Sequence, residues 1–183
     1  VYARAVDAAV RLIPGAEAAT LLVREGDAFR YAAAHGYVLG ELQALGDFGE
    51  EEELRWYRLG RDAYERGVPR RLRGDEIAPS SASSVRDPAQ AAVLRGPGRV
   101  PELRATICVP IVAAGDVLGT LNVDNLSLEE AFGDGEMALA EAFGQQIGVI
   151  IRQTQARQAL AEAAITDPVT GLGNREGFNR RLE

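Results

Sequence analysis

Polar side chains alternate with apolar ones along two neighbouring segments in the second half of the chain, 105–113 and 117–124. Successive side chains of a strand point to opposite faces, so we expect these polar groups to share one face of a sheet. They suit hydrogen bonding to a small molecule, and no nucleophile–base pair for catalysis is visible. The predicted ligand-binding residues are Thr106, Cys108, Thr120, Asn122 and Asp124, with arginines from the middle of the chain, such as Arg70, Arg71 or Arg73, closing over them.

A simpler interpretation of this face stays open, in which Asn122 and Asp124 only hydrogen-bond the neighbouring loop. Cys108 and His35 are the single cysteine and the single histidine of the chain. One cysteine excludes an internal disulfide and a multi-cysteine metal site, so no metal ligand is predicted. We interpret Cys108 as a buried, inert thiol rather than a redox sensor, and His35 as a surface or packing residue.

Composition narrows the class of protein further. The 183 residues carry a net charge of −7, which disfavours binding to a nucleic-acid backbone. A hydrophobic fraction of 46% supports a real core. No run approaches the ~18 apolar residues that a membrane span requires, and no signal peptide is visible. The single cysteine makes a reduced, cytoplasmic compartment the simplest interpretation. The chain starts at Val1 and stops at Glu183 within a helical pattern, and we expect both ends to be cuts in a longer protein.

The first part of the chain predicts a helix followed by a β-hairpin. Helical spacing over 1–13 ends at Pro14-Gly15, strands are expected over 19–24 and 29–35, and Gly26 lies in the turn between them. The apolar face of the predicted helix consists of Val6, Ala9, Val10 and Ile13.

The middle of the chain has a weaker pattern. The acidic run Glu50–Glu53 is interpreted as the solvated start of a helix that continues to Arg66 and ends at Gly67. A short strand is expected over 68–72. Residues 74–101 are rich in Gly, Pro and Ser and predict a long connection, with a helix over 87–95.

The second half predicts another hairpin and then a long helix. On the return strand, Val117, Gly119, Leu121 and Val123 are expected to face the core. Asp134 is the expected N-cap of a helix that nothing breaks through Ala164. Its apolar positions are Ala140, Phe143, Ile147 and Ile150. The last part of this helix has apolar spacing that only partly fits a coiled coil. We expect it to pair with the same helix of a second copy, which gives a homodimer through the terminal helices.

This order of elements resembles a GAF domain. The matching segments are Ala18–Val23, Cys108–Ile111 with Gly115, and Leu118–Asn125, followed by Phe132, Asp134 and Gln145-Gln146. The resemblance spans residues 1–153. It implies an α+β fold with a central antiparallel sheet, helices packed on one face, a pocket on the other, and a long C-terminal signalling helix.

The resemblance also implies that the domain binds a small molecule, since relatives bind ligands such as cyclic nucleotides and tetrapyrroles. The residues of this chain disfavour several of these ligands. Relatives that bind cyclic nucleotides carry an Asn-Lys pair, whereas this chain has Asn125-Leu126, so that route is disfavoured. Covalent bilin attachment commonly uses a Cys with an adjacent His, which Cys108 lacks, and haem binding through His35 is equally disfavoured. Relatives that reduce methionine sulfoxide use several cysteines, and this chain has one.

A second, shorter resemblance begins at Asp167. The string Asp167–Arg175 followed by Phe178 is similar to the opening segment of GGDEF domains, the family of diguanylate cyclases. In that family the groups that bind GTP and the metal lie further along the domain than Glu183. The resemblance implies that this chain has no cyclase activity and no cofactor of its own. The parent protein is expected to condense two GTP molecules into cyclic di-GMP with magnesium.

The predicted organisation is therefore a GAF sensor domain over 1–153, a helical linker over 154–166 and a truncated GGDEF start over 167–183. The expected function is control of a diguanylate cyclase by a small-molecule-sensing, dimerising module. The alternative is a ligand-free dimerisation scaffold for the same cyclase.

Overall fold

The computed structural model describes residues 1–77 and 102–165, the last four of them by their backbone alone. The described elements follow in the order α1 (Tyr2–Leu12), β1 (Ala18–Glu25), β2 (Ala28–His35), α2 (Leu39–Gln43), β3 (Phe48–Gly49), α3 (Glu50–Tyr57), α4 (Arg61–Glu65), β4 (Arg70–Arg73), the 3₁₀ turn η1 (Gly74–Glu76), β5 (Ala105–Ala113), β6 (Asp116–Asn125) and α7 (Asp134–Ile165). The helix expected over 87–95 and the segment 167–183 lie outside the described residues.

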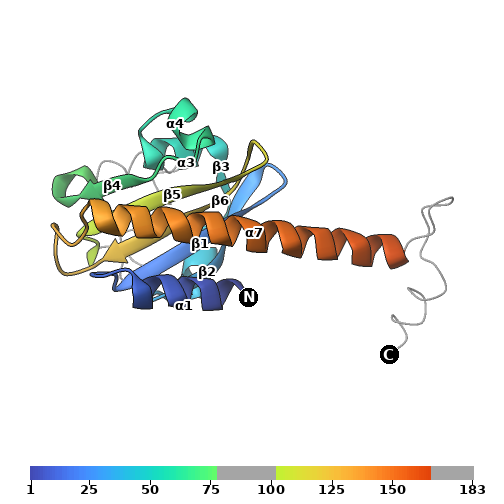
Figure 1. Cartoon of the computed structure of the whole chain (residues 1–183), viewed down its shortest axis with the longest axis horizontal. Helices are drawn as coiled ribbons and strands as arrows, with labels where there is room; N and C mark the ends of the chain where they lie inside the picture. The colour runs from blue at the N-terminus through green and yellow to red at the C-terminus, as the bar shows by residue number, and fades with distance from the viewer. Residues whose placement is uncertain (78–101, 166–183) are drawn as a thin grey trace.

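The six strands form one antiparallel sheet in the order β3-β2-β1-β6-β5-β4. The predicted hairpins β1–β2 and β5–β6 lie together because β1 pairs directly with β6. Helices α1 and α7 cover one face of the sheet, and α3 and α4 lie on its other side (Figure 1). The fold is therefore the expected α+β architecture, with two differently covered faces.

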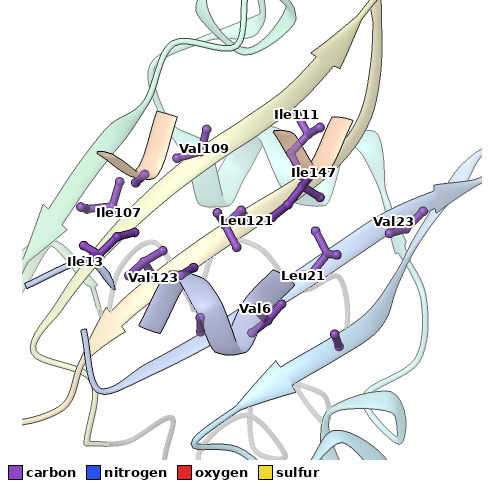
Figure 2. Packing of buried hydrophobic residues seen from close by; sticks show 14 of the residues in the cluster. Val6, Ile13, Leu21, Val23, Ile107, Val109, Ile111, Leu121, Val123 and Ile147 are labelled. Atoms are coloured by element: carbon purple, nitrogen blue, oxygen red, sulfur yellow. The ribbon is translucent and has the colours of Figure 1, made fainter. Parts of the chain in front are cut away.

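The main core lies between the sheet and the helices α1 and α7. Figure 2 shows Val6 of α1, Ile13 just after α1, and Ile147 of α7 over apolar side chains of the central strands. Of the predicted apolar face, Val6, Ala9 and Ile13 are buried, and Val10 is half-buried against the same core. On α7 the buried apolar side chains are Ala140, Ile147 and Ile151, while the predicted Phe143 and Ile150 are half-buried.

A β-bulge changes which side chains of β6 face this core. The register between β5 and β6 shifts between Ile111 and Val112, so that Ile111 pairs with Gly119 and Val112 with Val117. An extra residue in one strand reverses the alternation beyond it. As a result Leu118 joins the core under α7, while Val117 packs on the opposite face. The prediction for Val117 was wrong because alternation was extended through the bulge.

The single helix expected over 50–66 is two helices. Tyr57 ends α3, Arg58 has a left-handed backbone (φ 60°), and Gly60 also has positive φ (85°), which an L side chain rarely adopts. The break brings Tyr57 and Tyr64 together as a ring pair 5.2 Å apart, and both are fully buried. The short strand expected over 68–72 is present as β4.

Helix α7 is continuous over 32 residues, as the absence of Gly and Pro after Arg152 predicts. Its N-cap is Gly133 rather than Asp134, because the Gly133 carbonyl accepts the Met137 N–H and the Glu136 side chain accepts the Gly133 N–H at 2.8 Å. Its C-terminal part extends beyond the sheet (Figure 1), and every side chain from Ala156 to Ala161 is exposed. Across residues 1–77 and 102–165, no helix combines the length and hydropathy of a membrane span.

Candidate functional site

The polar residues predicted on β5 and β6 do share one face of the sheet, opposite α7. The strand register places Thr106 beside Asp124, Cys108 beside Asn122, and Pro110 beside Thr120. All of the predicted polar side chains here are buried, with at most 8% of Asn122 exposed. We call this set the polar strip: Thr106, Cys108, Thr120, Asn122 and Asp124.

Of the predicted arginines, only Arg70 lies beside the polar strip. Its strand partner is Cys108, and its guanidinium donates to the backbone carbonyl of Tyr57. This hydrogen bond links the end of α3 to the edge strand β4. Burial lowers the pKa of Arg70 from its ordinary value.

Arg71 and Arg73 do not close over the strip. Alternation along β4 turns both toward the other face, where Arg71 Nη1 donates to the Phe132 carbonyl at 2.7 Å and Arg73 pairs with Glu130. The two arginines instead line an open depression of about 420 Å³ together with Asp75 and Glu76. The prediction for Arg73 was wrong, because a strand of four residues is too short for its sequence to show which side chains face the strip.

Helices α3 and α4 cover the polar strip and satisfy most of its hydrogen bonds. Thr120 Oγ1 donates to Glu53 Oε2 at 2.9 Å and lies 3.2 Å from the Tyr64 hydroxyl. The Trp56 indole donates to Asn122 Oδ1 at 3.1 Å, and Asn122 Nδ2 donates to Thr20 Oγ1 at 3.3 Å. The strip is thus closed over by side chains of the same chain.

Glu53 belongs to this candidate site, although the sequence pattern did not predict it. The acidic run was interpreted as solvated, but Glu52 and Glu53 are only 6% and 5% exposed. A signal was present, because Glu53 stands three and four residues before Trp56 and Tyr57 and so shares their helical face. Burial raises the pKa of Glu53 to about 7, the Thr120 hydrogen bond opposes this rise, and the nearby Glu52 adds to it.

Asp124 lies two residues beyond Asn122, towards the end of β6. The Tyr37 hydroxyl donates to its Oδ2 at 2.8 Å. Burial raises the pKa of Asp124 to about 6, against the opposing effect of the Thr106 and Tyr37 hydroxyls. Although Thr106 is near enough to act on this pKa, neither Thr106 Oγ1 nor Asp124 Oδ1 meets a partner with hydrogen-bond geometry.

Cys108 and His35 behave as the sequence suggested. Cys108 is fully buried, and burial followed by the negative Glu53 raises the pKa of its thiol, so the reactive thiolate is disfavoured. His35 Nδ1 lies 2.8 Å from Asp7 Oδ1 and links β2 to α1. In the described part of the chain, no three His, Cys, Asp or Glu side chains gather into a potential metal site.

Comparison with known proteins identifies this architecture. The GAF domain is the family whose model matches the chain, over residues 1–151. The match spans most of the sequence, and the protein belongs to the GAF family. GAF domains are sensory and regulatory modules that bind small molecules in signalling proteins. No curated protein matches the sequence.

Several solved structures share the fold at low sequence identity. The blue-light absorbing form of the PixJ GAF domain of Thermosynechococcus elongatus is 14% identical with a TM-score of 0.60, covering 87% of this chain and 88% of that one. A GAF domain/HD domain protein of Geobacter sulfurreducens is 14% identical with a TM-score of 0.55, covering 83% and 90%. A type II free methionine-R-sulfoxide reductase of Thermoplasma acidophilum is 14% identical with a TM-score of 0.55, covering 82% and 89%.

Proposed function

We propose that this chain is the sensory module of a diguanylate cyclase, in which occupancy of the polar strip is passed through α7 to a GGDEF domain that begins at Asp167. The observation that carries the proposal is the continuity of α7 from the sheet to Ile165, next to the GGDEF-like string. The chain itself, in which no nucleophile–base pair is visible, is proposed to be non-catalytic, in a cytoplasmic parent protein that uses GTP and magnesium.

The packing supplies a route between the strip and α7. Along β5, Cys108 faces the strip, while its neighbour Val109 faces the opposite side and contacts α7 at Gly144. A Cβ on Gly144 would lie 2.7 Å from Val109 Cγ1, so strand and helix are in close contact there. A displacement of β5 by a bound ligand should therefore move α7, because closely packed elements transmit strain.

Dimerisation belongs to the same proposal. The extension of α7 beyond the sheet carries Leu160 with 71% of its surface exposed, and Val149 is 57% exposed on the same helix. Isolated helical tails of this kind are marginal in water unless a partner covers them. A second copy of α7 is the partner we propose, since joining two GTP molecules requires two cyclase domains to face each other.

The ligand should be detectable on the purified chain. We expect a small molecule to co-purify in stoichiometric amount, or a member of a metabolite library to raise the melting temperature by several degrees, because a ligand that binds only the folded state stabilises it. Mass spectrometry of the denatured extract and thermal-shift screening measure the two outcomes. If both are negative, the ligand-free scaffold replaces the sensor, a reading favoured by the closure of the strip by α3 and α4.

If α7 transmits the signal, the cyclase activity of the parent protein should depend on the rotational position of the cyclase domain about the helix axis. Insertion of one, two or three residues after Gln158 in the parent protein rotates the cyclase by roughly 100° per residue, whereas seven residues restore the original phase to within about 20°. Cyclic di-GMP synthesis should change with the short insertions and recover with the long one. Activity that falls steadily with insert length would contradict transmission by rotation.

A further inference from the structure

A second row of residues runs along α7 on the side opposite the core. The side of the helix that packs on the sheet consists of Ala140, Gly144, Ile147 and Ile151, all of them buried. Because each residue turns an α-helix by about 100°, the side chains that point the other way recur at alternating steps of three and four. We call this row the outer seam, and all its members are exposed: Leu139, Ala142, Gln146, Val149, Gln153, Ala156 and Leu160.

The spacing of the outer seam is that of a coiled coil. Steps of three and four alternate without a break, so the row stays on one side of the helix over roughly 30 Å, or about three heptads. The first core position of the heptad is occupied by Leu139, Gln146, Gln153 and Leu160. The second is occupied by Ala142, Val149 and Ala156. The seam therefore has the pattern that pairs one helix with another.

Charge is missing from this side of the helix, where a solvated helix normally carries it. Of all residues in the chain 26% are charged, yet every exposed side chain of α7 from Ala138 to Ala156 is uncharged. Large apolar side chains are exposed instead, with 42% of Leu139, 57% of Val149 and 71% of Leu160 accessible. Figure 1 shows no other described element across this side of α7. Such a face favours contact with another surface over contact with water.

The two glutamines specify the partner. A glutamine amide both donates and accepts a hydrogen bond, so it can pair with a copy of itself across a two-fold axis. In a parallel pair of α7 helices in the same register, each seam residue meets its own counterpart, and Gln146 and Gln153 each form such an amide pair. An antiparallel pair would set each amide against alanine or valine. The seam therefore fits a second copy of this chain in the parallel orientation.

We propose that the outer seam binds a second copy of this chain, as a parallel, in-register pair of α7 helices with the two sheets on its outer sides. The inference rests on the dimerisation in the proposed function, and it names the face and the orientation of that contact. Parallel pairing also brings both C-terminal ends of α7 together, where the cyclase domains are proposed to begin. Two amide layers and two alanine layers bury little apolar surface, so we expect a weak dimer that forms at micromolar concentrations.

Sedimentation velocity of the full chain measures the dimer. Val149→Glu places two like charges in the middle of the seam and should weaken dimerisation at least about tenfold. Gln158→Glu is the matched control, because Gln158 is exposed on the same helix but points away from the seam, and it should leave dimerisation unchanged. Since Val149 is 57% exposed, its replacement should leave the fold intact, which circular dichroism checks.

Oxidative cross-linking measures the orientation. Gln146→Cys and Gln153→Cys should each give a disulfide-linked dimer, because in a parallel pair each new thiol faces its own copy. Gln158→Cys is the control and should stay uncross-linked over the same time. The native Cys108 is fully buried and does not compete.

The outcomes separate this inference from the proposed function. A dimer that Val149→Glu leaves intact overturns the outer seam, while dimerisation through another surface stands. A dimer that Val149→Glu disrupts, but that neither seam cysteine cross-links, overturns the parallel register. A chain that is monomeric at every concentration and is not cross-linked overturns both the seam and the proposed dimerisation, and the sensor then depends on the ligand experiments alone.

Discussion

Replacement of Gly119 by alanine should destabilise the domain by at least about 3 kcal/mol. A Cβ at this position would lie 2.2 Å from the backbone oxygen of Leu22 and 3.3 Å from the Cα of Val23. Both atoms belong to β1, whose pairing with β6 joins the two hairpins at the centre of the sheet. Backbone atoms cannot rotate away as a side chain can, so relief of the overlap requires the two strands to separate.

Urea denaturation followed by circular dichroism measures this effect. Gly40→Ala is the matched control, because a Cβ at Gly40, in helix α2, meets nothing within 4 Å. That substitution should be neutral or stabilise by up to about 1 kcal/mol through helix propensity. A Gly119→Ala protein with the unfolding midpoint of the wild type would show that β1 and β6 are not in this close contact.

Glu53→Gln should change how stability depends on pH. The folded pKa of about 7 lies above the ordinary value of 4.5. The folded state therefore holds the proton more tightly than the unfolded state, and this contribution is complete below pH 4.5 and is lost as pH rises through 7. The loss amounts to about 3 kcal/mol at most. Glutamine keeps an acceptor for Thr120 without the buried charge, so the variant should be more stable at pH 8 by about 1–3 kcal/mol.

The readout is the free energy of unfolding in urea between pH 4.5 and 8. As pH rises above 6, the free energy of unfolding of the wild type should fall, and the variant should lack most of this fall. As pH rises towards 6, the fall that Asp124 contributes should persist in the variant, because its folded pKa of about 6 is also raised. Glu52→Gln is the control, because the neighbouring Glu52 carboxylate pairs with Arg55 at 3.3 Å and accepts the Gly49 N–H at 2.7 Å. It should not stabilise the protein at pH 8. An unchanged pH profile for Glu53→Gln would mean that Glu53 is solvated.

Elements with local signals were the predictable part of the fold. The apolar face of α1, both hairpins and the long α7 follow from periodicity and turn residues, and all are present. The polar strip was predictable for the same reason, since strand alternation alone places Thr106, Cys108 and Asn122 on one face. Local signals failed at Val117, where a bulge reverses the alternation, and at Arg58, where a left-handed residue divides the expected helix.

The cover of the strip was not predictable from local pattern. Glu53 and Trp56 reach Thr120 and Asn122 across 67 and 66 positions of sequence. Charged side chains ordinarily lie at the protein surface. Only the packing of α3 over the sheet turns Glu53 inward and raises its pKa.

By itself the sequence determined the class of this protein, because the strand alternation, the helix periodicity and the GAF-like segments depend on residues that are neighbours in the chain. Only the tertiary structure decided which polar side chains are covered and which acids are buried. Burial and hydrogen bonding depend on contacts between residues that are distant in sequence. Asp124 and Glu53 are therefore buried, with raised pKa values, only once β1, β5, β6 and α3 are assembled.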